Sequence, residues 1–138
     1  PRLLIADEPT SGLDGALRWD VAGLLRRGPL APPALLLVTH DLRLARAVCD
    51  RVVVMLGGRV VERVAAGGLG AGPHHPHTRA LLAAAGIGPP ATPGLSLRSP
   101  GPGGTLRSSC TLASPGCARP VPLRIRTTGH AIACPAVP

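Results

Sequence analysis

The fold is decided by the stretch Pro1–Asp14, which reads PRLLIADEPTSGLD. Its apolar run, Leu3–Ala6, has the pattern of a short strand buried on both faces of a parallel sheet. The run ends in Asp7 and Glu8, and the next residue, Pro9, cannot continue a hydrogen-bonded ladder. The two carboxylates are therefore expected at the carboxyl end of a parallel strand, the edge where open α/β sheets bind ligands.

Downstream of this stretch, helices and strands are expected to alternate. Asp14 is a suitable N-cap for a helix whose apolar positions 17, 21, 24 and 25 share one face and which ends at Gly28. A second buried run, Leu35–Thr39, leads into His40 and Asp41. Asp41 can cap a further short helix that ends near position 48. The strand–helix–strand order predicts an α/β sheet with crossover connections.

The next part of the chain predicts a hairpin and one more helix. Two β-rich runs, Arg51–Leu56 and Arg59–Val64, flank a Gly-Gly pair, which is a strong signal for a two-residue turn. We therefore expect residues 1–64 to form an α/β domain part with a hairpin. Residues 65–88 are expected to form a linker and a helix over Thr78–Ala85, and residues 89–138 an irregular or disordered extension rich in Pro, Gly and Arg.

Charge is spread unevenly along the 138 residues. All seven acidic residues lie in residues 1–62, whereas residues 63–138 contain seven arginines and no acid, and the net charge is +8. No apolar run approaches the ~20 residues of a membrane helix, and no signal peptide is predicted. Four cysteines without an export signal do not indicate a disulfide scaffold. These features predict a soluble, cytosolic protein.

Three ordered motifs resemble parts of one known family. The run Ala6–Asp14 (ADEPTSGLD) resembles the Walker B motif and D-loop of ABC-type ATPases, which commonly read ADEPTSALD. Leu35–Asp41 (LLLVTHD) resembles the strand before that family's switch histidine, and Arg51–Glu62 (RVVVMLGGRVVE) resembles its C-terminal hairpin. The resemblance implies the C-terminal part of a P-loop NTPase domain of the ABC type.

This resemblance implies roles for five residues, together with ATP and Mg²⁺ as cofactors. Asp7 would hold Mg²⁺ through water, Glu8 would act as the general base on the attacking water, and His40 would contact the γ-phosphate. Ser11 and Asp14 of the D-loop would reach a second ATPase subunit across a head-to-tail dimer. A simpler role stays open for two of them, because Asp14 can serve as a helix cap and His40 as a loop-end histidine.

Two later motifs resemble one subfamily. His75–Ala84 (HPHTRALLAA) is similar to the HPYTRALL segment of the ATPases that power import of oligopeptides, dipeptides and nickel, and Gly129–Cys134 (GHAIAC) is similar to the GHxxAC ending of their extension. That extension often carries four cysteines that bind an iron–sulfur cluster. Here Cys110, Cys117 and Cys134 are only three, and six residues separate the first two. Both features depart from the pattern, so no cluster is predicted. The histidines at positions 74, 75 and 77 are interpreted as a helix-entry loop rather than a metal site.

The sequence also lacks the elements that hold the triphosphate. It has no GxxxxGK[ST] loop and no lysine, and the ABC signature would normally precede position 1. We therefore expect the ATP-binding subunit of a peptide or nickel importer, present as a partial domain that is inactive alone. Its expected partners are permease subunits and a second ATPase subunit, on the cytoplasmic face of the plasma membrane.

Three other functions stay open. They are an ATPase of another ABC system, a non-functional remnant and, more distantly, a basic nucleic-acid-binding protein. Arginines could bind phosphates, but Trp19 is the one aromatic residue and offers no platform on which bases could stack. No nucleic-acid partner is therefore expected.

Overall fold

The computed structural model describes residues 2–28, 34–72, 74–88, 110 and 112–137. The chain divides into two compact units, Pro1–Asp50 and Arg51–Pro138. The sequence had suggested a boundary after residue 64 instead. The difference arises because the hairpin at residues 51–65 pairs with a strand from the C-terminal tail and so belongs to the second unit.

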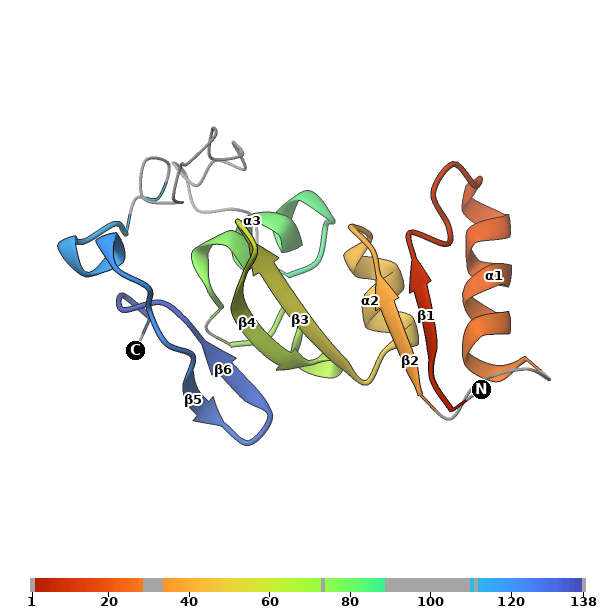
Figure 1. The fold of residues 1–138 in the computed structure, drawn as a ribbon. Helices are drawn as coiled ribbons and strands as arrows, with labels where there is room; N and C mark the ends of the chain where they lie inside the picture. Colours follow the sequence, from red (N-terminus) through yellow and green to blue (C-terminus); the bar gives the residue numbers. More distant parts are fainter. Residues whose placement is uncertain (1, 29–33, 73, 89–109, 111, 138) are drawn as a thin grey trace. The chain divides into compact units, whose positions relative to one another are not determined.

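The first unit is a two-stranded parallel sheet with two helices (Figure 1). The register pairs Leu4 with Leu35 and Asp7 with Val38, so both strands end at the same edge. The order of the elements agrees with the alternation that the sequence predicts. In chain order they are β1 (Leu4–Asp7), α1 (Gly15–Arg27), β2 (Leu35–Val38) and α2 (Leu42–Val48).

The core of this unit lies on one face of its sheet. Ala22 of α1 is buried there together with Leu44 and Val48 of α2. Leu35 and Leu37 of β2, and Cys49 just after α2, are partly buried and pack against them. On the other face, Ile5, Leu36 and Val38 are 63%, 51% and 48% exposed. The expectation that both faces of these strands are buried is thus wrong, because the described helices of the unit cover only one face.

In its described residues, the second unit contains a four-stranded antiparallel sheet and one α-helix (Figure 1). The strand order is β3-β4-β6-β5, and the hairpin between β3 and β4 turns at Gly57 and Gly58, whose φ angles are 55° and 75°. Both angles fit the type I′ turn that the Gly-Gly pair predicts. The elements are β3 (Arg51–Leu56), β4 (Arg59–Ala65), the short 3₁₀ helix η1 (Ala66–Gly68), α3 (Pro76–Ala84), the 3₁₀ helix η3 (Pro115–Ala118), β5 (Arg124–Thr127) and β6 (His130–Ile132).

The C-terminal tail is not irregular throughout, and this corrects the sequence-based expectation. Strand β6 pairs with β4, with Glu62 opposite Ile132 and Arg63 opposite Ala131, and β5 pairs with β6. Strands of three and four residues are too short for an alternating pattern to stand out, so only the long-range pairing reveals them. Residues 89–109 lie outside the described residues. No helix in the described part of the chain is long and apolar enough to cross a membrane.

Candidate functional site

The two carboxylates after β1 lie at the shared carboxyl edge of the parallel sheet. Asp7 is the last residue of β1 and is exposed, and Glu8 follows it. The backbone N–H of Glu8 donates to the carbonyl oxygen of Val38 over 2.8 Å, which ties this position to the end of β2. Glu8 has a φ of 46°, in the left-handed region that residues other than glycine seldom occupy. Such backbone strain clusters at functional sites.

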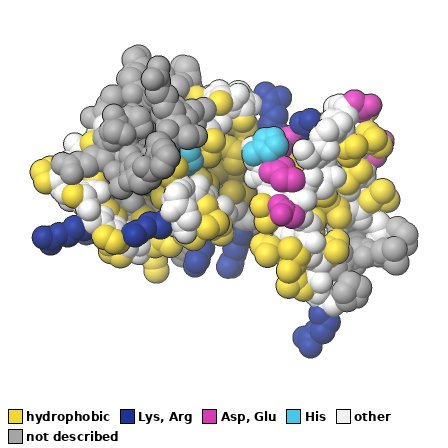
Figure 2. Space-filling model, turned by 45° about the horizontal axis from the view of Figure 1, so that its top comes forward, with side chains coloured by type: hydrophobic (Ala, Val, Ile, Leu, Met, Phe, Trp, Pro, Cys, Tyr) yellow, Lys and Arg dark blue, Asp and Glu magenta, His cyan; other side chains and the backbone are white. Residues whose placement is uncertain are grey.

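Glu8 is in direct contact with His40, which follows β2. One carboxylate oxygen, Oε1, accepts the backbone N–H of His40 over 3.1 Å and lies 2.9 Å from its Nδ1. The side chains of Glu8 and His40 are 36% and 82% exposed, so a ligand can approach this edge from solvent. Figure 2 shows acidic and histidine side chains next to one another on an exposed surface. The parallel register therefore brings together two groups that are 32 positions apart in the sequence.

A second pair of charged side chains fixes the segment that carries His40. Asp41 caps α2 by accepting the backbone N–H groups of Arg43 and Leu44, and it forms a 2.9 Å ion pair with Arg18 of α1. Burial would raise the pKa of Asp41, but the hydrogen bonds from Leu44, Arg18 and Arg43 outweigh it and hold the pKa below its usual value. The guanidinium of Arg18 also donates to the carbonyl oxygen of Leu13. Sequence reasoning assigned no role to Arg18.

Replacing Asp41 by alanine should destabilise the first unit by about 1–2 kcal/mol, the usual cost of losing an N-cap. The measurement is urea unfolding followed by the fluorescence of Trp19, which lies on α1. Asp50→Ala is the matched control, because Asp50 is 94% exposed and its contact with Arg26 spans 3.6 Å. The Asp50→Ala control should leave the urea concentration at the midpoint of unfolding unchanged. Equal losses in both variants would contradict the anchoring role of Asp41.

Ser11 and Asp14 lie in the connection from β1 to α1. The backbone N–H of Ser11 donates to the carbonyl oxygen of Glu8 over 3.0 Å, so this connection starts with a tight turn. The carboxylate of Asp14 accepts the backbone N–H of Leu17 over 2.9 Å and caps α1. Ser11 and Asp14 are exposed. Contact of these two residues with a second subunit stays a prediction.

The second unit holds a buried polar cluster that sequence reasoning missed. Glu62 of β4 is fully buried, and its Oε1 lies 2.6 Å from Nδ1 of His74 and 2.8 Å from Nε2 of His130. Its other oxygen, Oε2, accepts the backbone N–H of His75 over 2.8 Å. The cluster links β4, the segment before α3 and the start of β6. We call Glu62, His74 and His130 the carboxylate clamp.

The ligand atoms of the carboxylate clamp lie within 4.8 Å of one another, as in a metal site. The polar atoms of the clamp, however, already have hydrogen-bond partners within the protein. Nε2 of His74 accepts the backbone N–H of Gly70 over 3.3 Å, so a neutral His74 ring carries its proton on Nδ1 and donates it to Glu62. Burial would raise the pKa of Glu62, but hydrogen bonds from His74, His130 and the backbone of His75 lower it overall. The clamp is therefore an ionised carboxylate held by donors.

His75 makes the stability of the second unit dependent on pH. The residue is 6% exposed, and burial lowers the pKa of its imidazole from 6.5 to about 4, against a smaller opposing effect of Glu62. In the unfolded chain the same ring takes up a proton near pH 6.5. Between pH 6.5 and 4 the unfolded state thus binds more protons, so stability is complete above 6.5 and falls as the pH drops.

We expect this loss to reach about 1.4 kcal/mol per pH unit within that window. Amide hydrogen exchange of peptides from β4 and α3, corrected for intrinsic rates, measures it. His75→Asn should flatten the dependence, because asparagine keeps an acceptor at the N-cap of α3 and does not titrate. His40→Asn should leave it unchanged, since His40 lies in the other unit. An unaltered slope in His75→Asn would contradict the assignment.

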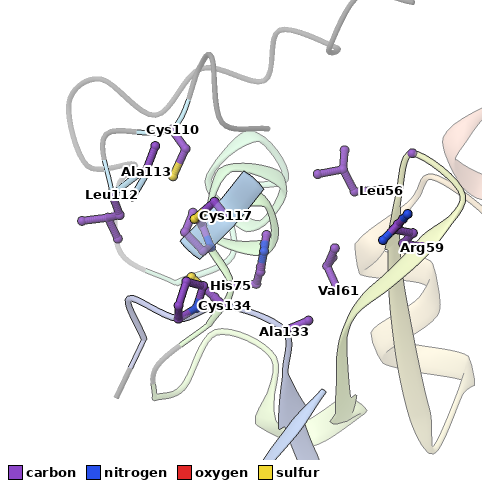
Figure 3. A pocket seen from close by; sticks show the side chains of 13 residues that line it. Leu56, Arg59, Val61, His75, Cys110, Leu112, Ala113, Cys117, Ala133 and Cys134 are labelled. Carbon is purple, nitrogen blue, oxygen red and sulfur yellow. The ribbon is translucent and has the colours of Figure 1, made fainter. Parts of the chain in front are cut away.

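The three cysteines of the tail surround one cavity in the second unit. Cys110, Cys117 and Cys134 all line a cavity of about 180 Å³, together with His75 (Figure 3). The chain has no other cysteine in this unit, and all three thiols are free. The three thiols therefore line the same cavity although they come from separate segments of the tail. The expectation of no cluster rests on the missing fourth cysteine and on the six-residue gap between Cys110 and Cys117, and it stays a prediction.

Comparisons with known proteins give a consistent group of relatives. No protein-family model matches the chain. The chain is 37% identical over 145 residues to putative peptide import ATP-binding proteins of Brucella ovis and Brucella abortus, covering 97% of the chain and 46% of each relative. It is 36% identical to a probable peptide ABC transporter ATP-binding protein of Sinorhizobium fredii, covering 97% of the chain and 43% of that relative. The chain thus spans somewhat less than half the length of the curated relatives it matches.

Proposed function

Because this chain belongs to the ABC transporter ATP-binding proteins, we propose that it supplies the carboxylate and histidine edge of an ATPase site that drives peptide import. The observation that carries the proposal is the contact between Glu8 and His40, 2.9 Å apart at the ends of adjacent parallel strands. Peptides are favoured over nickel because the names of the similar proteins include peptide transport or peptide import.

Glu8 is the proposed general base. Its carboxylate is held by the His40 backbone and ring, which leaves the second oxygen, Oε2, available to accept a proton from a water molecule. The strained backbone at Glu8 is fixed by its hydrogen bond to β2, so the carboxylate is positioned before a substrate arrives. His40, largely exposed beside it, is the proposed contact to the terminal phosphate.

Asp7 is the proposed residue for Mg²⁺. Its exposed carboxylate stands at the same edge, and oxygen ligands are the ones that Mg²⁺ prefers. When bound, Mg²⁺ supplies neutralisation of the charge on the triphosphate. The phosphate-binding loop is absent from these 138 residues, so the proposed site needs the matching N-terminal part of such a subunit.

The proposed partners follow from the same site. Ser11 and Asp14 are exposed on the turn after Glu8, where a second ATPase subunit would complete a shared site. Peptide import also requires permease subunits, so we propose a position at the cytoplasmic face of the membrane, held by those subunits.

A chimeric protein tests the proposal. Residues 1–138 replace the matching part of the Brucella ovis relative, whose own N-terminal part stays in place. The chimera should hydrolyse ATP in the presence of Mg²⁺. The 138-residue chain alone should show negligible ATP binding by calorimetry, because it lacks the phosphate-binding loop.

Two further results complete this test. Asp7→Asn in the chimera should raise the Mg²⁺ concentration needed for half-maximal hydrolysis, because a carboxylate that holds the ion is lost. Asp20→Asn, the same change at an exposed acid on α1, should not. A folded chimera that binds ATP but hydrolyses none would contradict the proposed role of this edge. Micromolar ATP binding by the chain alone would show that the nucleotide is held in another way.

A further inference from the structure

Three free thiols from separate segments line one cavity of the second unit. Cys110 precedes η3, Cys117 lies within η3, and Cys134 follows β6 (Figure 3). Cys134 is buried and the other two are half-buried. The cavity of about 180 Å³ is several times larger than the ~30 Å³ that a water molecule occupies in the liquid. A small oxidant therefore has room beside these thiols.

The packing of η3 against the segment after β6 singles out one pair of these thiols. A Cβ atom placed on Gly116 would lie 3.9 Å from Cγ of Pro135, and these two residues are the chain neighbours of Cys117 and Cys134. Of the other two thiols in the cavity, Cys117 has the larger electrostatic effect on Cys134, and Cys110 has the smaller. Because such an effect falls with distance, Cys117 is the nearer partner of Cys134.

The two thiols of this pair differ in the way that a two-step oxidation requires. Cys117 is half-buried, and the hydroxyl of Ser114 lies 3.6 Å from its sulfur. Burial raises the pKa of the buried Cys134 thiol, against hydrogen bonds from the backbone N–H groups of Ala136 and Val137. Oxidation of cysteine follows exposure and thiolate character, so Cys117 is suited to react first and Cys134 to react second.

We propose that Cys117 and Cys134 form a reversible disulfide bond within the chain when hydrogen peroxide enters this cavity. The Cys117 thiolate attacks one peroxide oxygen and the O–O bond breaks, which gives a sulfenic acid and one molecule of water. The sulfur of Cys134 then attacks the sulfenic sulfur, so the S–S bond forms, the S–O bond breaks and a second water leaves. The two thiols lose two electrons and two protons in total, and the peroxide is reduced to two molecules of water.

The disulfide bond would fasten the last strand of the second unit. Cys134 lies just beyond β6, the strand that carries His130 of the carboxylate clamp. A bond to Cys117 closes a covalent ring that contains β5 and β6, and such a ring reduces the conformational freedom of the unfolded chain. The oxidised unit should therefore open less often than the reduced one. The thiol pair and the proposed ATPase edge belong to different units, so the proposal does not rest on ATP hydrolysis.

Titration of the reduced 138-residue chain with hydrogen peroxide tests the proposal. After alkylation of the remaining thiols and digestion with trypsin, mass spectrometry should show peptides 108–124 and 127–138 joined by a bond that dithiothreitol cleaves. Cys117→Ser and Cys134→Ser should lose the joined peptides, whereas Cys110→Ser and the control Cys49→Ser should keep them. Joined peptides that persist in Cys117→Ser would assign the bond to Cys110 and overturn the pairing. Their absence from the wild type would overturn the proposal altogether.

A second measurement uses only the wild-type chain, so it does not depend on variants that fold. Amide hydrogen exchange of peptides from β6 should slow by about 10²-fold on oxidation, the effect of closing a ring of this length, and dithiothreitol should restore the faster exchange. Exchange of peptides from β1 and β2 should not change, because these strands belong to the other unit. Equal exchange of β6 in both redox states, or covalent dimers in place of a monomer with an internal bond, would contradict the proposal.

Discussion

Glu8→Gln is expected to slow ATP hydrolysis by the chimera about 10²–10⁴-fold, the range associated with removal of a general base. Glutamine has nearly the same shape, and its amide oxygen can still accept the backbone N–H of His40. It cannot take up a proton from water. ATP binding should therefore persist while turnover is lost, and the measurements are steady-state phosphate release and calorimetric ATP binding.

The control for this change is Asp20→Asn, the same carboxylate-to-amide replacement at an exposed position of α1. It should leave the rate within about twofold of the unsubstituted chimera, because surface substitutions away from special features have small effects. A Glu8→Gln chimera that keeps half its rate would remove Glu8 from the chemistry. The contact with His40 would then be only structural.

Glu62→Ala is expected to destabilise the second unit by about 3–5 kcal/mol, the cost of breaking a buried charged cluster by removing one member. Three donors lose their acceptor at once, namely the two imidazoles of His74 and His130 and the backbone N–H of His75. Because Trp19 lies in the other unit, its fluorescence does not report this loss. The loss of stability is instead measured by amide hydrogen exchange of peptides from β4, α3 and β6.

Two variants on the same strand sharpen this prediction. Glu62→Gln keeps the side-chain volume and one acceptor oxygen. Its loss of protection against amide hydrogen exchange should therefore be smaller than that of Glu62→Ala. Arg63→Ala changes the neighbouring exposed side chain and should cause no measurable loss. Unchanged exchange in β6 of Glu62→Ala would show that the carboxylate clamp does not hold this strand.

The edge that carries Asp7, Glu8 and His40 could be predicted from the sequence for a physical reason. Each residue follows a short apolar run, and parallel strands in an α/β unit end at a common edge. The contact between Glu8 and His40 then follows from the register alone, in which Asp7 lies opposite Val38. The Gly57-Gly58 turn was predictable because only glycine adopts both positive φ angles without strain.

The carboxylate clamp could not be predicted in this way. Glu62 stands in a strand pattern whose exposed and buried positions alternate imperfectly, since β3 and β4 change register near Val54. Its partner His130 is 68 positions away, and no local pattern links residues at such a distance. The two short tail strands were missed for the same reason. Both strands are stabilised by pairing in the sheet that β4 starts, and the intrinsic β-strand propensity of so few residues contributes little.

The exposed sheet face of the first unit was also missed, and for a different reason. A continuous apolar run predicts cover on both sides. The described residues provide helices for one side only, which leaves Ile5, Leu36 and Val38 largely exposed. The sequence pattern therefore indicates strands suited to apolar contacts on both faces, whereas the described residues make such contacts on one face only.

The pairing of β6 with β4 also decides when the second unit can form during synthesis on the ribosome. The backbone N–H of Ala133 donates to the carbonyl oxygen of Val61, so β4 waits for a segment that is synthesised later. At translation rates of about 5–20 residues per second, that wait lasts several seconds. During this wait Glu62 lacks its contact with His130 of β6, and the nascent hairpin keeps an open edge that a neighbouring chain could occupy.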